Sequence, residues 1–215
     1  MADEIYVQII TADGTELGEV WEDSVELYAL RQLKKANQPV IKTMYVEMLN
    51  YGAAAQVYFK YDVENLANAE LTEEEKAYGL ETVKLENNRV ADENYEGSQL
   101  NLVNSIQLRM QFKNIDSSMY AISSFTNHLG KKVETRIDGS EFIHEGRMVV
   151  VKTIVAADYK QDVTVTVYSA EGEAVATAVD SVASYIARMS SGNAIYDAVA
   201  KFTAAAHAYL HRNDG

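Results

Sequence analysis

Two histidines near the C-terminal end have a spacing that could support chemistry. His207 and His211 are four residues apart, so a helix would place both imidazoles on one face, where they could share a zinc ion. A zinc protease of that type needs a glutamate directly after the first histidine, and Ala208 occupies that position. We therefore expect a solvated helix face and no metal site.

The sequence contains no other recognisable catalytic set. It has no glycine-rich phosphate loop and no serine elbow, and without cysteine it can form neither a thiolate nucleophile nor a disulfide. Asp92, Glu93 and Glu96 could hold calcium in a loop, although a solvated acidic loop is the favoured interpretation. No pair of carboxylates is singled out for glycoside hydrolysis, since such pairs are spaced in three dimensions. We predict no enzymatic activity and no cofactor.

Aromatic side chains are the remaining candidates for ligand recognition. Tyr6 and Tyr168 fall on the strand face opposite the valines and isoleucines, and Tyr95 is expected in a polar loop. Trp21 is the one tryptophan. Exposed tyrosine and tryptophan favour recognition of proteins or sugars, so we take these four residues as the candidate binding residues.

Composition narrows the choice of partner. The chain of 215 residues has 19 basic and 32 acidic residues, a formal net charge of −13. Nucleic acid and anionic membrane surfaces are therefore unsuitable partners, because both attract clustered lysine and arginine. No apolar run approaches the roughly 20 residues that span a bilayer, so we expect no membrane insertion.

One sequence pattern occurs twice, at residues 4–61 and 162–212. Each copy has an alternating strand, a turn containing Gly14 or Gly172, and an Asp-Ser-Val signal for the start of a helix. An alanine triplet then recurs in the second helix of each copy. A repeat of this length indicates a modular array, and we predict a β-hairpin followed by an αα-hairpin in each copy.

Between the two copies the pattern is that of short strands. The clearest alternation runs through residues 106–112, where apolar and polar side chains alternate. Further strands are expected at 82–85, 118–125, 133–137, 148–156 and 162–168.

These patterns predict an α+β protein. We expect an antiparallel, immunoglobulin-like β-sandwich, with the unit of β-hairpin and αα-hairpin present twice. Residues 1–62 would be the end of a preceding module, 63–79 an acidic connector, and 80–212 a sandwich closed by the second αα-hairpin. The chain is therefore interpreted as a piece of a longer, multi-module protein.

The string YGAAAQVYF at residues 51–59, with NLANA at 65–69, resembles a repeat of large secreted or wall-attached surface proteins of Gram-positive gut anaerobes. The second copy departs from it, with Thr203 and His207 in place of Gly52 and Gln56. Some proteins of this architecture are adhesins, glycan binders or immunoglobulin-binding superantigens. The resemblance implies an extracellular, secreted or wall-attached location and a non-catalytic role, and it supplies no site residues.

We accordingly expect a binding or adhesion module whose partner is a host protein, with an immunoglobulin as the candidate that the resemblance suggests. One alternative is a carbohydrate-binding module for a dietary or host polysaccharide. The single tryptophan counts slightly against that alternative, because sugar platforms use tryptophan as well as tyrosine. Another alternative is a structural spacer.

Overall fold

The computed structural model describes residues 5–103, 105–138, 143–189 and 192–213. The chain divides into two compact units, the first formed by residues 1–82 with 208–215 and the second by residues 83–207. Each unit is described by itself.

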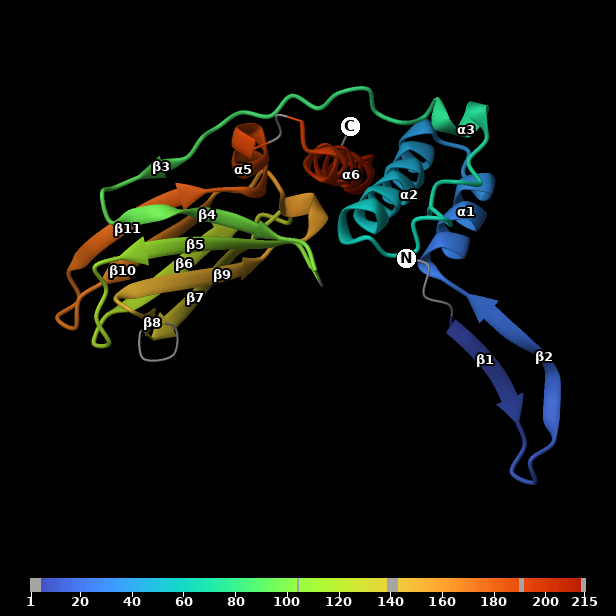
Figure 1. Ribbon diagram of the computed structural model, residues 1–215, viewed down its shortest axis with the longest axis horizontal. Helices are drawn as coiled ribbons and strands as arrows, with labels where there is room; N and C mark the ends of the chain where they lie inside the picture. The colour runs from blue at the N-terminus through green and yellow to red at the C-terminus, as the bar shows by residue number, and fades with distance from the viewer. Residues whose placement is uncertain (1–4, 104, 139–142, 190–191, 214–215) are drawn as a thin grey trace. The chain divides into compact units, whose positions relative to one another are not determined.

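The first unit begins with a β-hairpin and continues with helices. In chain order it contains β1 (Ile5–Ile10), β2 (Glu16–Asp23), α1 (Val25–Lys35), α2 (Pro39–Phe59) and α3 (Glu73–Lys76). β1 and β2 pair antiparallel, and no other described strand joins them (Figure 1). Each strand of this hairpin therefore has one unpaired edge.

Local sequence signals explain where these elements begin and turn. Gly14 has a φ of +88°, a conformation that costs glycine little, and its amide donates to the Thr11 carbonyl at 2.9 Å. The Ser24 hydroxyl accepts from the amide of Leu27 at 3.0 Å and caps α1. Pro39 occupies the first turn of α2, where its missing amide proton costs nothing.

A small apolar core lies between α1, α2 and the segment that follows α2. Its buried members are Ala29, Leu30, Leu33, Val46, Leu49, Ala67 and Leu71. The buried Gln56 side chain accepts from the amide of Ala67 and donates to the carbonyl of Asn65, both at 2.8 Å. The segment 63–79 therefore packs into this unit.

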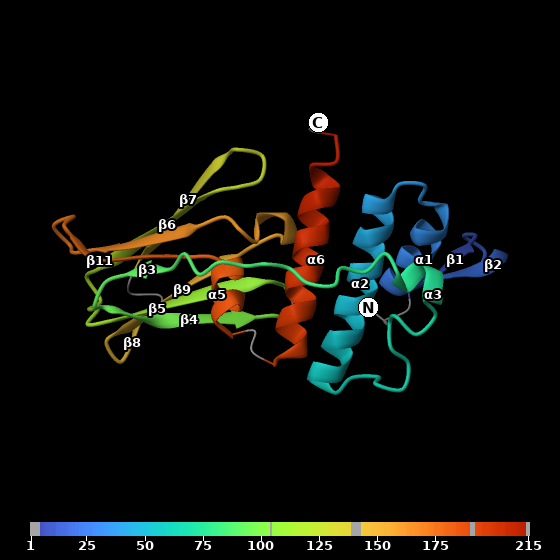
Figure 2. The ribbon, with the colours of Figure 1, turned by 90° about the horizontal axis from the view of Figure 1, so that it is seen from above.

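The second unit contains two antiparallel sheets. Its strands are β3 (Val90–Ala91), β4 (Tyr95–Asn101), β5 (Gln107–Lys113), β6 (Tyr120–Thr126), β7 (Lys132–Asp138), β8 (Ile143–His144), β9 (Arg147–Thr153), β10 (Val163–Tyr168) and β11 (Ala174–Asp180). The first sheet has the order β3-β11-β10-β6-β7 and the second the order β4-β5-β9-β8. Figure 2 shows the sheets as two layers.

Each sheet buries one face, as strand alternation requires. The residues of β5, β9 and β10 that are almost fully buried are Leu108, Met110, Phe112, Met148, Val150, Val163, Val165 and Val167. Fully burying a side chain of this size stabilises a fold by about 1.5–3 kcal/mol, so these strands provide much of the core of the second unit.

Helices complete the second unit. The 3₁₀ turn η1 (Ala156–Asp158) precedes β10, and α5 (Val182–Met189) and α6 (Ala194–Leu210) follow β11. Tyr185 of α5 and Tyr196 of α6 meet edge to face, with ring centroids 5.7 Å apart. Ala205 is almost fully buried.

The structure is α+β with antiparallel sheets, as the sequence predicted. The expected strand at 82–85 is wrong, because this segment is not paired with any strand that the structure describes. Val83 and Leu85 instead border the same hollow as Ile186 and Ala200 of the helices. The alternation in this segment therefore reflects packing beside helices. β4 was not expected from the sequence.

Candidate functional site

Two of the four aromatic candidates lie on the hairpin of the first unit. Tyr6 is opposite Glu22 and Trp21 is opposite Val7, and both aromatic side chains are more than half exposed. Adjacent positions of a strand point to opposite faces, so Tyr6 and Trp21 lie on different faces of the hairpin. They do not form one site.

Tyr95, the third candidate, is directed into the second unit. Its ring packs against Phe112 with centroids 5.4 Å apart, and its hydroxyl donates to the Asp180 carboxylate at 3.3 Å. Burial raises the pKa of Tyr95 to about 12. The contacts of Tyr95 are those of an internal residue.

Asp180 is the centre of a buried polar cluster that links β4, β11 and α5. Its carboxylate, which is 0% exposed, pairs with the Arg188 guanidinium at 2.6 Å and accepts from the Ser98 hydroxyl at 2.6 Å. Arg188 also donates to Asn87 and Ser184, each at 2.9 Å. The donors around Asp180 compensate for the cost of burying its charge.

Sequence reasoning missed this cluster, although a signal for it was present. Asp180 and Arg188 are separated by the same eight positions as Asp23 and Arg31 in the first copy. Asp23 and Arg31 also form an ion pair, at 2.5 Å. The repeated spacing of opposite charges could therefore have identified both pairs.

Tyr168, the fourth candidate, belongs to a stack on the other face of the five-stranded sheet. Its ring lies parallel to that of Tyr120 within 16°, with centroids 5.2 Å apart. The guanidinium of Arg136 lies 3.5 Å from the centroid of the Tyr120 ring and donates to Asp138 at 3.0 Å. This arrangement is a half-buried cation–π stack across β7, β6 and β10.

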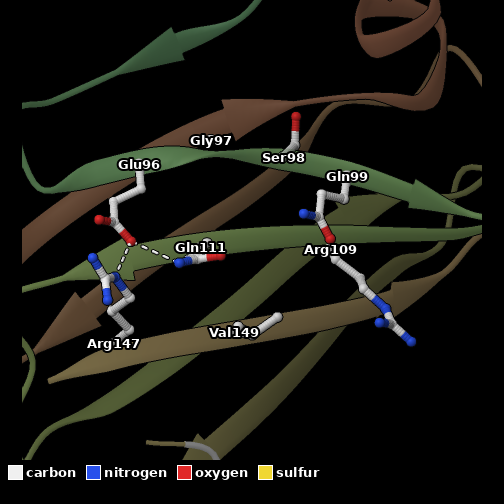
Figure 3. Close-up of a pocket in the computed structure, with 8 residues that line it drawn as sticks. All are labelled: Glu96, Gly97, Ser98, Gln99, Arg109, Gln111, Arg147 and Val149. Atoms are coloured by element: carbon white, nitrogen blue, oxygen red, sulfur yellow. Dashed lines mark hydrogen bonds and ion pairs between the residues drawn. The ribbon is translucent and has the colours of Figure 1, made fainter. Parts of the chain in front are cut away.

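A hollow of about 430 Å³ lies on the outer face of β4, β5 and β9 (Figure 3). Its lining is mostly polar and consists of Glu96, Gly97, Ser98, Gln99, Arg109, Gln111, Arg147 and Val149. None of these residues is among the four aromatic binding candidates, although Glu96 is one of the three acidic residues considered for calcium.

One end of the hollow is a charge cluster. Glu96 accepts from Arg147 at 2.8 Å and from the Gln111 amide at 2.7 Å. The hydrogen bond from Arg147 is the main reason why the pKa of Glu96 lies below its ordinary value. Glu96 is thus held ionised, and Arg147 remains partly exposed beside it.

The other end of the hollow contains Arg109 and Gln99, which are paired across β4 and β5. Figure 3 shows Arg109 extending away from the cluster of Glu96 and Arg147. Its Nη2 donates weakly to Gln107 at 3.4 Å, whereas its Nε is buried and has no partner among the described residues. Because this Nε is buried, a ligand in the hollow could reach Arg109 only through the Nη groups of its guanidinium.

The lining can bind a ligand through hydrogen bonds and charge. Arginine and glutamine side chains offer donors for carboxylates and main-chain carbonyls. The Ser98 hydroxyl is committed to Asp180, and Glu96 is held by Arg147. The geometry is therefore that of a recognition surface.

Asp92 and His207, two of the residues considered for metals, have other contacts. Asp92 accepts from the amide of Asn94 at 2.9 Å, and the ring of His207 lies 3.1 Å from the carbonyl of Ala157. In the described ranges, no group of three or more histidine, aspartate or glutamate side chains is placed to hold a metal ion.

Comparison of the chain with protein-family models, with curated proteins and with solved structures finds no match. Among the helices that the structure describes, none has the length and hydropathy needed to cross a bilayer. The site must therefore be interpreted from its own chemistry.

Proposed function

We propose that this chain is a non-catalytic extracellular module of a bacterial surface protein and that it binds a host protein. An immunoglobulin is the candidate partner that the sequence resemblance suggests. The observation that carries the proposal is the polar hollow on β4, β5 and β9, where Arg109 and Gln111 lie beside Arg147, which stays partly exposed.

The chemistry of this hollow suits a polypeptide better than a sugar. Among the described residues that line it, none is aromatic, whereas sugar sites use aromatic platforms. Its amide and guanidinium groups match main-chain carbonyls and acidic side chains. Arginine is also enriched among the residues that dominate protein interfaces.

We further propose that residues 4–61 and 162–212 are two copies of one unit, which consists of a β-hairpin followed by an αα-hairpin. The turns support this, because Gly14 and Gly172 have φ angles of +88° and +87°. The helices support it too, because Tyr28 meets Tyr45 edge to face at 6.3 Å, as Tyr185 meets Tyr196. In this proposal residues 80–212 form one module with an immunoglobulin-like sandwich, and 1–62 end a preceding one.

Binding of immunoglobulin by single-residue variants tests the role of the hollow. We expect Arg109→Ala and Arg147→Ala each to weaken binding by about 30-fold, the effect of losing about 2 kcal/mol at an interface. Arg136→Ala is the matched control, because Arg136 lies on the other sheet and should leave affinity unchanged. Surface plasmon resonance with immobilised immunoglobulin measures all three variants. No binding by the parent chain, or equal loss in all three variants, would contradict the proposal.

Carbohydrate binding is the second candidate, and the stack of Tyr168, Tyr120 and Arg136 favours it. Half-buried tyrosine rings can contact the apolar face of a sugar ring. If this surface binds a glycan, a glycan array should detect a ligand for the parent chain that Tyr168→Ala loses and Arg109→Ala keeps. The two sets of variants thus separate the two functions.

A further inference from the structure

The β1–β2 and β10–β11 hairpins share a pairing register. Ile5 lies opposite Asp23 as Val163 lies opposite Asp180. The same register continues to the pairs Val7–Trp21 and Val165–Ala178. Both turns are closed by a glycine at positive φ. The two hairpins can therefore be compared position by position from this end.

The environments of the two hairpins differ completely. β10 pairs antiparallel with β6, β11 pairs with β3, and the inward face of this hairpin is buried. β1 and β2 pair only with each other in the part of the chain that the structure describes. An isolated two-stranded hairpin is marginally stable in water.

The unpartnered hairpin nevertheless has a face suited to burial. Its large apolar side chains on the face of Val7 are about half exposed or more and comprise Ile5, Val7, Ile9, Leu17 and Trp21. Exposed apolar patches of this kind mark interaction sites. The free edge of β1 also lacks charged residues and proline, the features that protect strand edges from pairing.

The ion pairs at the ends of the two hairpins also differ in how far they are buried. The side chains of Asp180 and Arg188 are 0% and 16% exposed, and β4 supplies Ser98 to both of them. The side chains of Asp23 and Arg31 are 13% and 43% exposed. In the second unit a β4-type strand thus covers this pair, and the first unit has no strand in that role among its described residues.

We propose that a two-sheet segment built like residues 83–161 docks on the β1–β2 hairpin. It would contact the β1 edge, the apolar face of the hairpin and the Asp23–Arg31 pair. This segment would belong to a neighbouring repeat placed before β1 in the same polypeptide, as residues 83–161 precede β10. In that segment, the strand equivalent to β6 pairs antiparallel with β1. The strand equivalent to β4 places a hydroxyl within hydrogen-bonding distance of Asp23. The inference rests on the repeat proposed above.

Trp21 determines which segments fit. It occupies the position of Ala178, which is 1% exposed in the second unit. An indole in place of a methyl group would overpack the interior of residues 83–161. The natural occupant must leave room for the indole, whereas residues 83–161 themselves should fit only a hairpin that carries Trp21→Ala.

A grafted chain tests this proposal. Residues 83–162 are joined directly to Ile5 of the chain carrying Trp21→Ala, which recreates the connection to β10. We expect exchange of the β1 amides with deuterium to slow by on the order of 100-fold relative to the ungrafted Trp21→Ala chain. The same graft on the chain that retains Trp21 should give little protection.

A matched pair of substitutions in the grafted chain identifies the face that is covered. Val7→Lys places a charge on the apolar face and should abolish the protection. Gln8→Lys places the same charge on the opposite face of β1 and should preserve it. Equal effects of the two substitutions would contradict the proposed docking face.

The ungrafted chain provides a second, independent measurement. Light scattering should find a monomer whose β1 amides exchange rapidly. A monomer with protected β1 amides, or a dimer in which a second copy protects them, would overturn the proposal, as would a graft that leaves β1 unprotected. Immunoglobulin binding through Arg109 and Arg147 is measured separately, so failure of either proposal can be recognised on its own.

Discussion

The contribution of an ion pair to the stability of this chain depends on how deeply the pair is buried. The pairs Asp180–Arg188 and Asp23–Arg31 are alike in spacing and chemistry, yet only Asp180 is fully removed from water. Breaking a buried pair leaves an uncompensated charge, whereas exposed ion pairs contribute little. The chain therefore contains its own matched control for the effect of burial.

The first prediction compares the two arginines. Arg188→Ala should lower the free energy of unfolding by about 3 kcal/mol, because the buried Asp180 carboxylate loses its cation. Arg31→Ala should lower the urea midpoint much less, because Arg31 is 43% exposed and Asp23 keeps some contact with water. Urea denaturation followed by circular dichroism measures both variants. Equal shifts would show that burial of Asp180 is not what distinguishes the pairs.

The second prediction concerns Tyr95. Burial raises its folded-state pKa to about 12, above the ordinary value of 10. The stability that this shift contributes is present below about pH 10 and is lost as the pH rises through about 12. Tyr95→Phe should therefore reduce the fall in melting temperature between pH 10 and 12. A part of the fall should remain, because the pKa of Tyr45 is also raised to about 12, chiefly by burial. Thermal unfolding of Tyr95→Phe that is as sensitive to this pH range as that of the parent would count against the assignment.

The sequence could identify aromatic candidates but not their surroundings. Tyr6 and Trp21 are exposed, as residues of a binding surface must be. Tyr95 is directed toward Asp180 instead, because β4 faces β11 across the two sheets. That contact joins positions 85 residues apart, and no local pattern encodes it. The hollow around Arg109 was missed for the same reason.

At the scale of elements, the two hairpins have nearly identical turns in different settings. The amide of Gly14 donates to Thr11 at 2.9 Å, and that of Gly172 donates to Ser169 at 3.0 Å. The second hairpin is part of a five-stranded sheet, whereas the first forms a sheet of two strands. The same local chemistry should therefore affect overall stability differently.

The third prediction uses these two glycines. Gly172→Ala should lower the melting temperature, because a side chain at φ of +87° costs about 1–2 kcal/mol. Gly14→Ala imposes the same strain at +88° but should leave the melting temperature unchanged, since the β1–β2 hairpin pairs with no other strand that the structure describes. Differential scanning calorimetry measures both variants. An equal drop for Gly14→Ala would indicate that the first hairpin unfolds together with the rest of the chain.

Elements with a clear period could be predicted and those without one could not. The alternation at 106–112 corresponds to β5, and the second helix expected in residues 4–61 corresponds to α2. β4 has polar residues at most positions and a register shift between Tyr95 and Gly97, so it lacks a simple period. The segment 82–85 has the period of a strand but lies beside helices. Only tertiary packing distinguishes these cases.

For the molecule as a whole, the dominant feature is an excess of acidic residues that gives a net charge of −13. Mutual repulsion among like charges opposes the compact state. Against this background the hollow on β4, β5 and β9 has a small basic excess, since it is lined by Arg109 and Arg147 and by one acidic residue, Glu96. This contrast should direct acidic segments of a partner toward the hollow, with an association rate that falls as salt is added.

The carboxyl groups divide into two classes with opposite effects on stability. Burial raises the pKa of Glu26 and Asp162 above their ordinary values, so their cost to the folded state is relieved as the pH falls. Hydrogen bonds from neighbouring side chains lower the pKa of Asp23, Glu96 and Asp116. The stability contributed by these three is present above the unfolded-state pKa of about 4 and is lost as the pH falls through their folded-state values.

The last prediction follows from these two classes and from the net charge. Lowering the pH from 8 to about 5 should raise the melting temperature, because the net negative charge falls and self-repulsion weakens. Below about pH 4 the melting temperature should fall, because the carboxylates with lowered pKa lose their hydrogen-bonded, ionised form. Adding 0.5 M sodium chloride, a concentration at which the screening length is about 4 Å, should raise the melting temperature more at pH 8 than at pH 5. Calorimetry across this range checks all three trends. A melting temperature that falls steadily from pH 8 to 5 would show that self-repulsion does not limit the stability of this chain.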